Sequence, residues 1–202
     1  MNSLPIDDKN PKLTSVTGTW RFMKRILVIG SGGAGKSTLA QRLGEILKLE
    51  VIHLDSLYWS SGWVEMRKDK WRTKVEQILK RDSWIIDGNY GGTLDIRLAA
   101  CDAVIFLDVS RLTCLKRVMK RVVSYRKHSR PDMAAGCPEK VNWPFMKYIW
   151  DYPRKRKPAV LEKLNFYSKT KAIVVLRSSR EVENFIASQV KSNRTSSSEK
   201  TF

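Results

Sequence analysis

One segment constrains the fold of this chain more than any other: Gly30-Ser31-Gly32-Gly33-Ala34-Gly35-Lys36-Ser37. It has the form G-x-x-x-x-G-K-S and directly follows the apolar run of residues 26–29. Glycines in such a loop let the backbone turn with positive φ, so that successive N–H groups face one anion at a helix N-terminus. The pattern is typical of the P-loop, in which Lys36 reaches the β- and γ-phosphates of ATP and Ser37 binds Mg²⁺.

Strand-like and helix-like patterns alternate along the rest of the chain. Helical periodicity covers residues 36–49, 68–81 and 112–123, and a last helix is expected after residues 178–181. The apolar, strand-like runs are residues 25–30, 51–54, 84–87, 103–108 and 172–176. This alternation predicts an α/β fold of the P-loop NTPase class, with a five-stranded parallel sheet and helices on both faces.

The ends and one internal segment do not follow this pattern. Residues 1–22 show no apolar periodicity and are expected to be a flexible extension, and residues 192–202 a disordered polar tail. Residues 23–191 are expected to form one domain. Within it, about residues 127–143 are rich in Arg, Pro and Gly and are interpreted as a lid, followed by a mostly helical return to the last strand.

Composition narrows the class of protein further. No run approaches the ~18 to 20 apolar residues of a membrane span, and no secretory signal is visible, so a cytoplasmic protein without membrane contact is expected. The three cysteines lack metal-site spacing and are expected to pack as thiols. The net charge of +18 suits either a polyanionic small substrate or DNA.

Three carboxylates end predicted strands, where parallel sheets bind ligands. Asp87 is the first choice for the magnesium site, against the alternative of an ordinary Asp-Gly turn, and Asp108 competes for that role or caps a helix. Asp55 either accepts the proton or hydrogen bond of the group to be phosphorylated, or caps a helix. Neighbouring His53 is expected to be a packing residue, as are Trp59 and Trp63.

A row of arginines lies on the basic helix and its continuation. Arg117 and Arg121 are spaced i, i+4, and Arg126 and Arg130 continue toward the predicted lid. Bidentate arginines neutralise the charge of a moving phosphoryl group, although a solvated basic face is the ordinary explanation for some of them. We expect Arg117 and Arg121 to face the phosphates when the lid closes.

Several of these segments together carry a resemblance. GSGGAGKST, HLD, WIIDGNYGGTLDIRL, IFLD and RPDMAAGCPEK resemble the bacterial DNA topology modulation protein family, an adenylate-kinase-related branch of P-loop proteins. The resemblance covers about residues 23–190. It implies a strand order 2-3-1-4-5, a mobile lid, ATP held by Gly30 to Thr38 with Mg²⁺, and lid arginines at Arg117 and Arg121.

The departures from that pattern concern the acceptor. Adenylate kinases carry Asp-Gly-Phe-Pro-Arg after the third strand, whereas this chain has Asp87-Gly88-Asn89-Tyr90. Arg97 either replaces the missing arginine or caps a helix, and AMP as acceptor is therefore in doubt. By the same resemblance, the turn containing Ser179 lies where such kinases hold adenine.

The leading interpretation is an ATP-dependent kinase of a small, nucleotide- or nucleoside-like acceptor, acting as a monomer or homodimer. In this interpretation Lys36, Mg²⁺ and the arginines stabilise the transferring phosphoryl group, and Asp55 assists the acceptor. The alternatives are an ATP-dependent DNA-binding or DNA-topology regulator and a P-loop switch with little turnover. The basic charge favours the first of these alternatives, but no DNA-binding motif is visible in the sequence.

Overall fold

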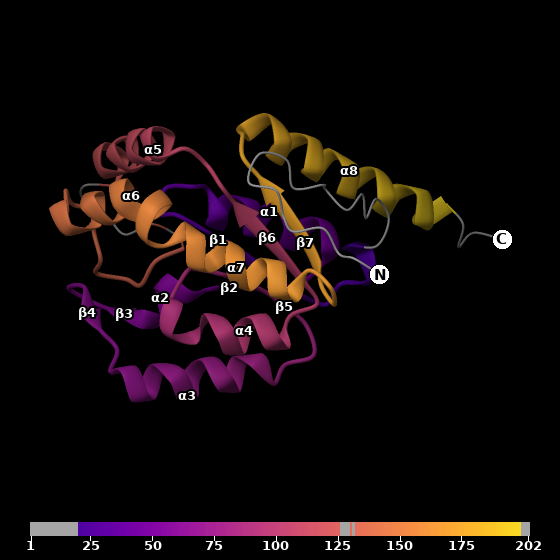
Figure 1. Ribbon diagram of the computed structural model, residues 1–202, viewed down its shortest axis with the longest axis horizontal. Coiled ribbons are helices and arrows are strands. Elements are labelled where there is room, and N and C mark those ends of the chain that lie inside the picture. Colours follow the sequence, from indigo (N-terminus) through magenta and orange to yellow (C-terminus); the bar gives the residue numbers. More distant parts are fainter. Residues whose placement is uncertain (1–19, 126–129, 131, 199–202) are drawn as a thin grey trace.

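A computed structural model describes residues 20–125, 130 and 132–198 of the chain (Figure 1). A five-stranded, wholly parallel sheet lies at the centre, in the order β2-β5-β1-β6-β7. Its strands are β1 (Arg25–Gly30), β2 (Val51–His53), β5 (Trp84–Asp87), β6 (Ala103–Leu107) and β7 (Ala172–Leu176). The predicted α/β class is confirmed, and the order of these five strands is the predicted 2-3-1-4-5.

Helices cover both faces of the sheet, as Figure 1 shows. The longer ones are α1 (Lys36–Leu47), α3 (Lys68–Leu79), α5 (Arg111–Ser124), α6 (Trp143–Lys155), α7 (Lys157–Tyr167) and α8 (Ser179–Ser198). Alternate residues of β1 divide the core in two. Val28 packs with α1, α5 and α8, whereas Leu27 packs with α3, α7 and α4 (Leu94–Ala100). Both faces are therefore buried, as expected for a parallel sheet.

Short elements after β2 and after β5 were not anticipated by the sequence patterns. Helix α2 (Leu54–Tyr58) begins directly at the strand end, and β3 (Trp59–Ser60) pairs antiparallel with β4 (Val64–Glu65) as a small hairpin. The 3-10 turn η2 (Gly91–Thr93) precedes α4. These elements surround the carboxyl end of the sheet, so they decide the shape of the ligand-binding edge.

The predicted chain ends differ from the structure at two places. Trp20, in the 3-10 turn η1 (Trp20–Phe22), is 1% exposed and meets Phe185 of α8 edge to face. It belongs to the core rather than to an extension because an indole ring buries a large apolar area. Helix α8 continues to Ser198, into the expected tail, because no glycine or proline interrupts it. Residues 1–19 and 199–202 lie outside the described residues.

The predicted lid is only partly described. Residues 127–129 and 131 lie outside the described residues, as does Arg126. Arg130 and residues 132–142 form neither helix nor strand, but Met133, Cys137 and Glu139 are buried. That this segment moves as a lid stays a prediction.

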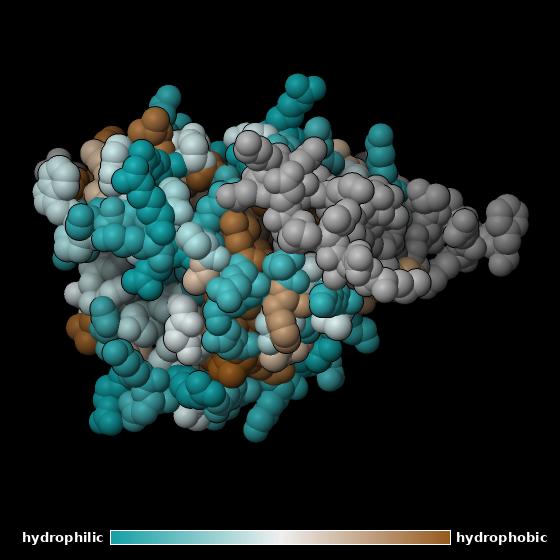
Figure 2. Space-filling model, in the orientation of Figure 1, coloured by the Kyte–Doolittle hydropathy of each residue, from teal (hydrophilic) through white to brown (hydrophobic). Residues whose placement is uncertain are grey.

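The space-filling view shows hydrophilic side chains over most of the face occupied by α7, with hydrophobic groups between them (Figure 2).

Candidate functional site

A large cleft of about 1290 Å³ opens beside the carboxyl end of the sheet. It is lined by P-loop residues, by α5 and α6, by the β3–β4 hairpin and by part of the 130–142 segment. The predicted site residues found along it are Lys36, Ser37, Thr38, Asp55, Asp87, Arg117 and Arg121. Tertiary structure thus brings together side chains from segments that are distant in sequence.

The P-loop connects β1 to the N-terminus of α1. Gly32, Gly33 and Gly35 line the cleft, while Gly30, Ser31 and Ala34 are buried behind it. The Lys36 ammonium donates to the Ser31 carbonyl at 2.9 Å, and burial lowers the pKa of Lys36. An ammonium held inside its own loop is positioned to meet phosphate oxygens there.

Glycine is required at Gly33 for two reasons. Its φ is +75°, and a Cβ atom would lie 2.4 Å from the Cys114 carbonyl oxygen. The loop therefore packs directly on the backbone of α5. This contact explains how a helix that follows the fourth strand of the parallel sheet comes to border the phosphate loop.

Arg117 connects α5 to both the P-loop and the start of α8. Its guanidinium donates to the Ala34 carbonyl at 2.8 Å and to the Ser179 hydroxyl at 2.9 Å. Ser179 itself is exposed, at the edge of the site. Arg117 and Ser179, two of the residues assigned to ATP from the sequence, are thus in direct contact with each other.

Asp87 lies at the end of β5, opposite His53 in the parallel pairing of β2 and β5. The two side chains meet at 3.2 Å, from His53 Nδ1 to Asp87 Oδ1, and this contact with Asp87 raises the pKa of His53. Asp87 is 3% exposed, and its Oδ2 has no hydrogen-bond partner among the described residues. His53 therefore does more than pack: β-strand register places its ring against the Asp87 carboxylate.

Asp108, the competing metal candidate, has cationic neighbours. Its Oδ2 lies 2.9 Å from Lys157 Nζ and 3.6 Å from Arg177 Nε. Asp108 does not cap α5, because the Ser110 hydroxyl accepts the N–H of Thr113 there. It is not among the residues that line the cleft.

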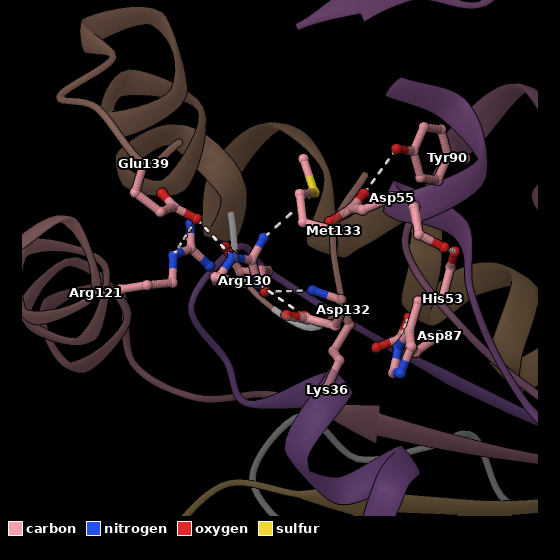
Figure 3. A network of polar contacts seen from close by, with 12 residues as sticks. Lys36, His53, Asp55, Asp87, Tyr90, Arg121, Arg130, Asp132, Met133 and Glu139 are labelled. Carbon is pink, nitrogen blue, oxygen red and sulfur yellow. Dashed lines mark hydrogen bonds and ion pairs between the residues drawn. The ribbon is translucent and has the colours of Figure 1, made fainter. Parts of the chain in front are cut away.

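Asp55 lies in the first turn of α2 and points into the cleft region shown in Figure 3. It accepts a hydrogen bond from the Tyr90 hydroxyl at 2.7 Å, and burial followed by the Asp55 charge raises the pKa of Tyr90. Tyr90 has a positive φ of 22°, an unfavourable conformation for a non-glycine residue. Its strained backbone aims the phenol at Asp55.

Arg97 maintains that strained turn. It is fully buried on α4, and its guanidinium donates to four backbone carbonyls, those of Gly88, Asn89, Tyr90 and Thr93. Burial lowers its pKa to about 10. Of the two hypotheses for Arg97, gripping an acceptor or capping a helix, the contacts agree with neither: the guanidinium is bound to the carbonyls of the turn that precedes α4.

Arg121 and Arg130 form a half-buried ionic network with Asp132 and the buried Glu139 (Figure 3). Glu139 Oε1 lies 2.9 Å from Arg121 Nε and 2.6 Å from Arg130 Nε. Arg130 also pairs with Asp132 at 2.8 Å. Sequence patterns did not single out Glu139 or Asp132, although acidic residues within such a basic segment are a usable signal.

The β3–β4 hairpin meets the 130–142 segment across the mouth of the cleft. Gly62 N–H donates to the Gly136 carbonyl at 2.9 Å, and the Trp63 indole donates to the Pro138 carbonyl at 3.0 Å. Trp59 and Trp63 are half-buried and line the cleft, contrary to the expectation that both belong to the core. Residue spacing in this segment carries no indication that the hairpin faces the site.

The fold defined by these elements is that of small P-loop kinases. Shikimate kinase from Acinetobacter baumannii, solved in complex with shikimate, superposes with a TM-score of 0.55 at 17% identity, over 92% of this chain and 99% of its own. A gluconokinase from Sinorhizobium meliloti 1021 gives a TM-score of 0.50 at 14% identity, over 87% and 94%. Similarity at this level establishes the fold alone.

Sequence comparison adds one distant relative. The uncharacterized protein YqaC of Bacillus subtilis (strain 168) is 24% identical over 127 residues, which are 62% of this chain and 70% of the relative. No protein-family model matches the chain. The resemblance to the topology modulation family therefore stays a prediction. Among the described residues, no helix is long and apolar enough to cross a membrane.

Proposed function

We propose that this protein is an ATP-dependent phosphotransferase that moves the γ-phosphoryl group of ATP to a small acceptor, of nucleotide or nucleoside type. The observation that carries the proposal is that Lys36 and Asp55 line one cleft, with Arg121 also on its wall. Lys36 belongs to a phosphate-binding loop, and Asp55 is a carboxylate outside it. One cleft thus offers both a donor side and an acceptor side.

The residues around the P-loop suit ATP and Mg²⁺. Asp87 Oδ2 is a buried carboxylate oxygen without a hydrogen-bond partner in the described part of the chain, and Ser37 lines the same cleft. Hard oxygen ligands of this kind suit Mg²⁺, which keeps several waters and binds through few protein groups together with phosphates. When bound, the ion would neutralise charge on the phosphates.

The chain's own residues would then divide the work. Lys36 and Arg117 would hold the phosphates of ATP, and Arg121 would neutralise charge on the transferring group. Asp55 would take the proton from the acceptor hydroxyl as its oxygen bonds to the γ-phosphorus and the bond to ADP breaks. Tyr90 and Arg97 would act indirectly, by fixing the position of Asp55.

The test begins with ATP itself. Calorimetric titration of ATP with Mg²⁺ should give saturable binding to the wild-type protein, and Lys36→Ala should weaken it about 100-fold or more. A panel of nucleosides, nucleotides and sugars should then contain a compound that stimulates ATP consumption by the wild type but not by Asp55→Asn. Unchanged binding to Lys36→Ala, or no stimulation across the panel, would reject the proposal.

A further inference from the structure

Two arginines beside the 130–142 segment, Arg121 and Arg130, are already paired with carboxylates. Each nitrogen of the Arg130 guanidinium contacts a neighbour: Nη1 pairs with Asp132, Nη2 donates to the Met133 sulfur at 3.7 Å, and Nε lies within ion-pair distance of Glu139 without the geometry of a hydrogen bond. The Arg130 side chain is 11% exposed and that of Glu139 is 5% exposed. Together with Arg121, the network holds two arginines and two carboxylates, so its net charge is zero.

Arg121 is the arginine of this network that can still contact a phosphoryl group. Its Nε is held by Glu139, at 2.9 Å. Its charge acts on Lys36 of the P-loop, and the charge of Asp55 acts on it in turn, so Arg121 lies within electrostatic reach of both sides of the reaction. Glu139 contacts only the Nε atom, so among the described residues the terminal nitrogens of Arg121 are left for a phosphoryl group in transit.

The opposite wall is acidic and aromatic, and His53, which also lines the cleft, faces the Asp87 carboxylate. Asp55 and Glu65 line the cleft, and each accepts a hydrogen bond from a tyrosine hydroxyl rather than from a cation. Trp59 and Trp63 lie beside them, with ring centroids 5.4 Å apart. Arg97 cannot bind an acceptor anion here, because its guanidinium already donates hydrogen bonds to backbone carbonyls. Lys140, which also lines the cleft, is exposed, so water screens its charge.

We propose that the phosphoryl acceptor is an uncharged or cationic ring compound bearing a hydroxyl group, and that Glu139 and Asp132 exclude acceptors that carry phosphate or carboxylate. This inference rests on the phosphotransferase function proposed above and narrows its acceptor class from nucleotide-like to nucleoside-like or similar compounds.

The physical reason is the cost of separating buried ion pairs. An acceptor anion can reach Arg130 only by displacing Glu139 or Asp132, which would leave a carboxylate buried without its cation. The same anion would approach Asp55 and meet like charge. An uncharged or cationic ring leaves the network intact. Such a ring can stack on the tryptophan side chains of the opposite wall, which offer apolar contact.

Matched pairs of acceptors test the charge rule directly. Adenosine against AMP, cytidine against CMP and glucose against glucose 6-phosphate should be compared by kcat/KM for ATP-dependent phosphorylation. In each pair that contains a substrate, kcat/KM for the uncharged member should be about 30-fold higher or more. Preference for the phosphorylated member would overturn this inference while leaving the phosphotransferase function in place.

A binding experiment tests the exclusion without turnover. With the donor site filled by a non-hydrolysable ATP analogue and Mg²⁺, inorganic phosphate should bind the wild type weakly. Glu139→Gln should bind it about tenfold more tightly, because Arg121 and Arg130 lose their shared counter-charge. Glu76→Gln, which changes an exposed carboxylate paired with Arg72 on α3, should match the wild type.

The outcomes separate the two proposals. Equal phosphate affinity of wild type and Glu139→Gln, with both proteins folded by circular dichroism, would overturn the exclusion by Glu139 whatever the turnover results. If Glu139→Gln does not fold, Asp132→Asn replaces it, with the same expected gain in phosphate affinity. Absence of any acceptor-stimulated turnover, in a protein that still gains phosphate affinity on Glu139→Gln, would reject the phosphotransferase function and keep the anion exclusion.

Discussion

The side-chain oxygen of Asn89 accepts a hydrogen bond from the backbone N–H of Gly30 at 3.0 Å, and so joins the loop after β5 to the first glycine of the P-loop. The amide nitrogen of the same residue donates to the Tyr148 hydroxyl of α6 at 2.9 Å. Asn89 therefore connects the phosphate loop, the strand that carries Asp87 and a helix of the cleft wall.

Replacing Asn89 should weaken ATP binding through this connection. Asn89→Ala removes both hydrogen bonds and should cost about 1 to 2 kcal/mol in nucleotide affinity, close to tenfold in Kd, because the first glycine loses its fixed position. Calorimetric titration of ATP measures the change. Tyr148→Phe keeps the Gly30 contact and should lose less than half as much; an equal loss in both variants would contradict this assignment.

Gly33 should tolerate no side chain. Gly33→Ala forces a left-handed backbone on alanine and a clash with the Cys114 carbonyl, which should destabilise the fold by about 2 kcal/mol or more and abolish ATP binding. Urea unfolding and ATP titration measure the two effects. Gly91→Ala is the matched control, because nothing lies within 4 Å of its added Cβ. Comparable losses in the two variants would contradict the packing argument.

Arg97 should be required for folding rather than for turnover alone. Arg97→Ala leaves four carbonyls, two buried and two partly buried, without their donor and should destabilise the protein by about 3 kcal/mol or more. Arg97→Lys should recover only part of this loss, since an ammonium cannot reproduce the planar fork. Denaturant unfolding provides the comparison with Arg72→Ala on the exposed face of α3, which should stay within about 0.5 kcal/mol of wild type. An unfolding free energy of Arg97→Ala equal to wild type would refute the role.

The His53–Asp87 contact predicts a pH dependence of stability. The pKa of His53 is raised in the folded protein, so its stabilising contribution is complete below the unfolded value of about 6.5 and is lost as pH rises through the higher folded pKa. Urea unfolding from about pH 6 to about pH 9 should show wild-type stability falling in that window. In His53→Gln this fall should be smaller. Parallel curves for both proteins would show that the contact carries no such linkage.

Trp20 should contribute to stability although it precedes the expected start of the domain. Trp20→Ala removes a ring that is 1% exposed and contacts Phe185, and should cost about 3 to 5 kcal/mol. Trp143→Ala removes a ring that is 76% exposed and should cost much less. Thermal unfolding followed by circular dichroism measures both. Equal melting temperatures for the two variants would place Trp20 outside the core.

Local patterns in the sequence determined most of the architecture. The phosphate loop, the five buried strands and the helices α1, α3 and α5 follow from glycine spacing and from hydrophobic periodicity, which act over a few neighbouring residues. Because the carboxyl ends of parallel strands meet at one edge of a sheet, the same patterns also predict that Asp55 and Asp87 lie near the loop.

Only the tertiary structure decided how those residues are partnered. His53 meets Asp87 through strand register, Arg97 turns inward to the carbonyls that follow β5, and Glu139 holds Arg121 from a segment without regular structure. Such pairings depend on spatial distances between residues that are far apart in the chain. The order of residues in the sequence does not give these distances. The phosphate loop was therefore predictable from eight residues, whereas the partners of the charged residues along the cleft depended on the packing of the whole domain.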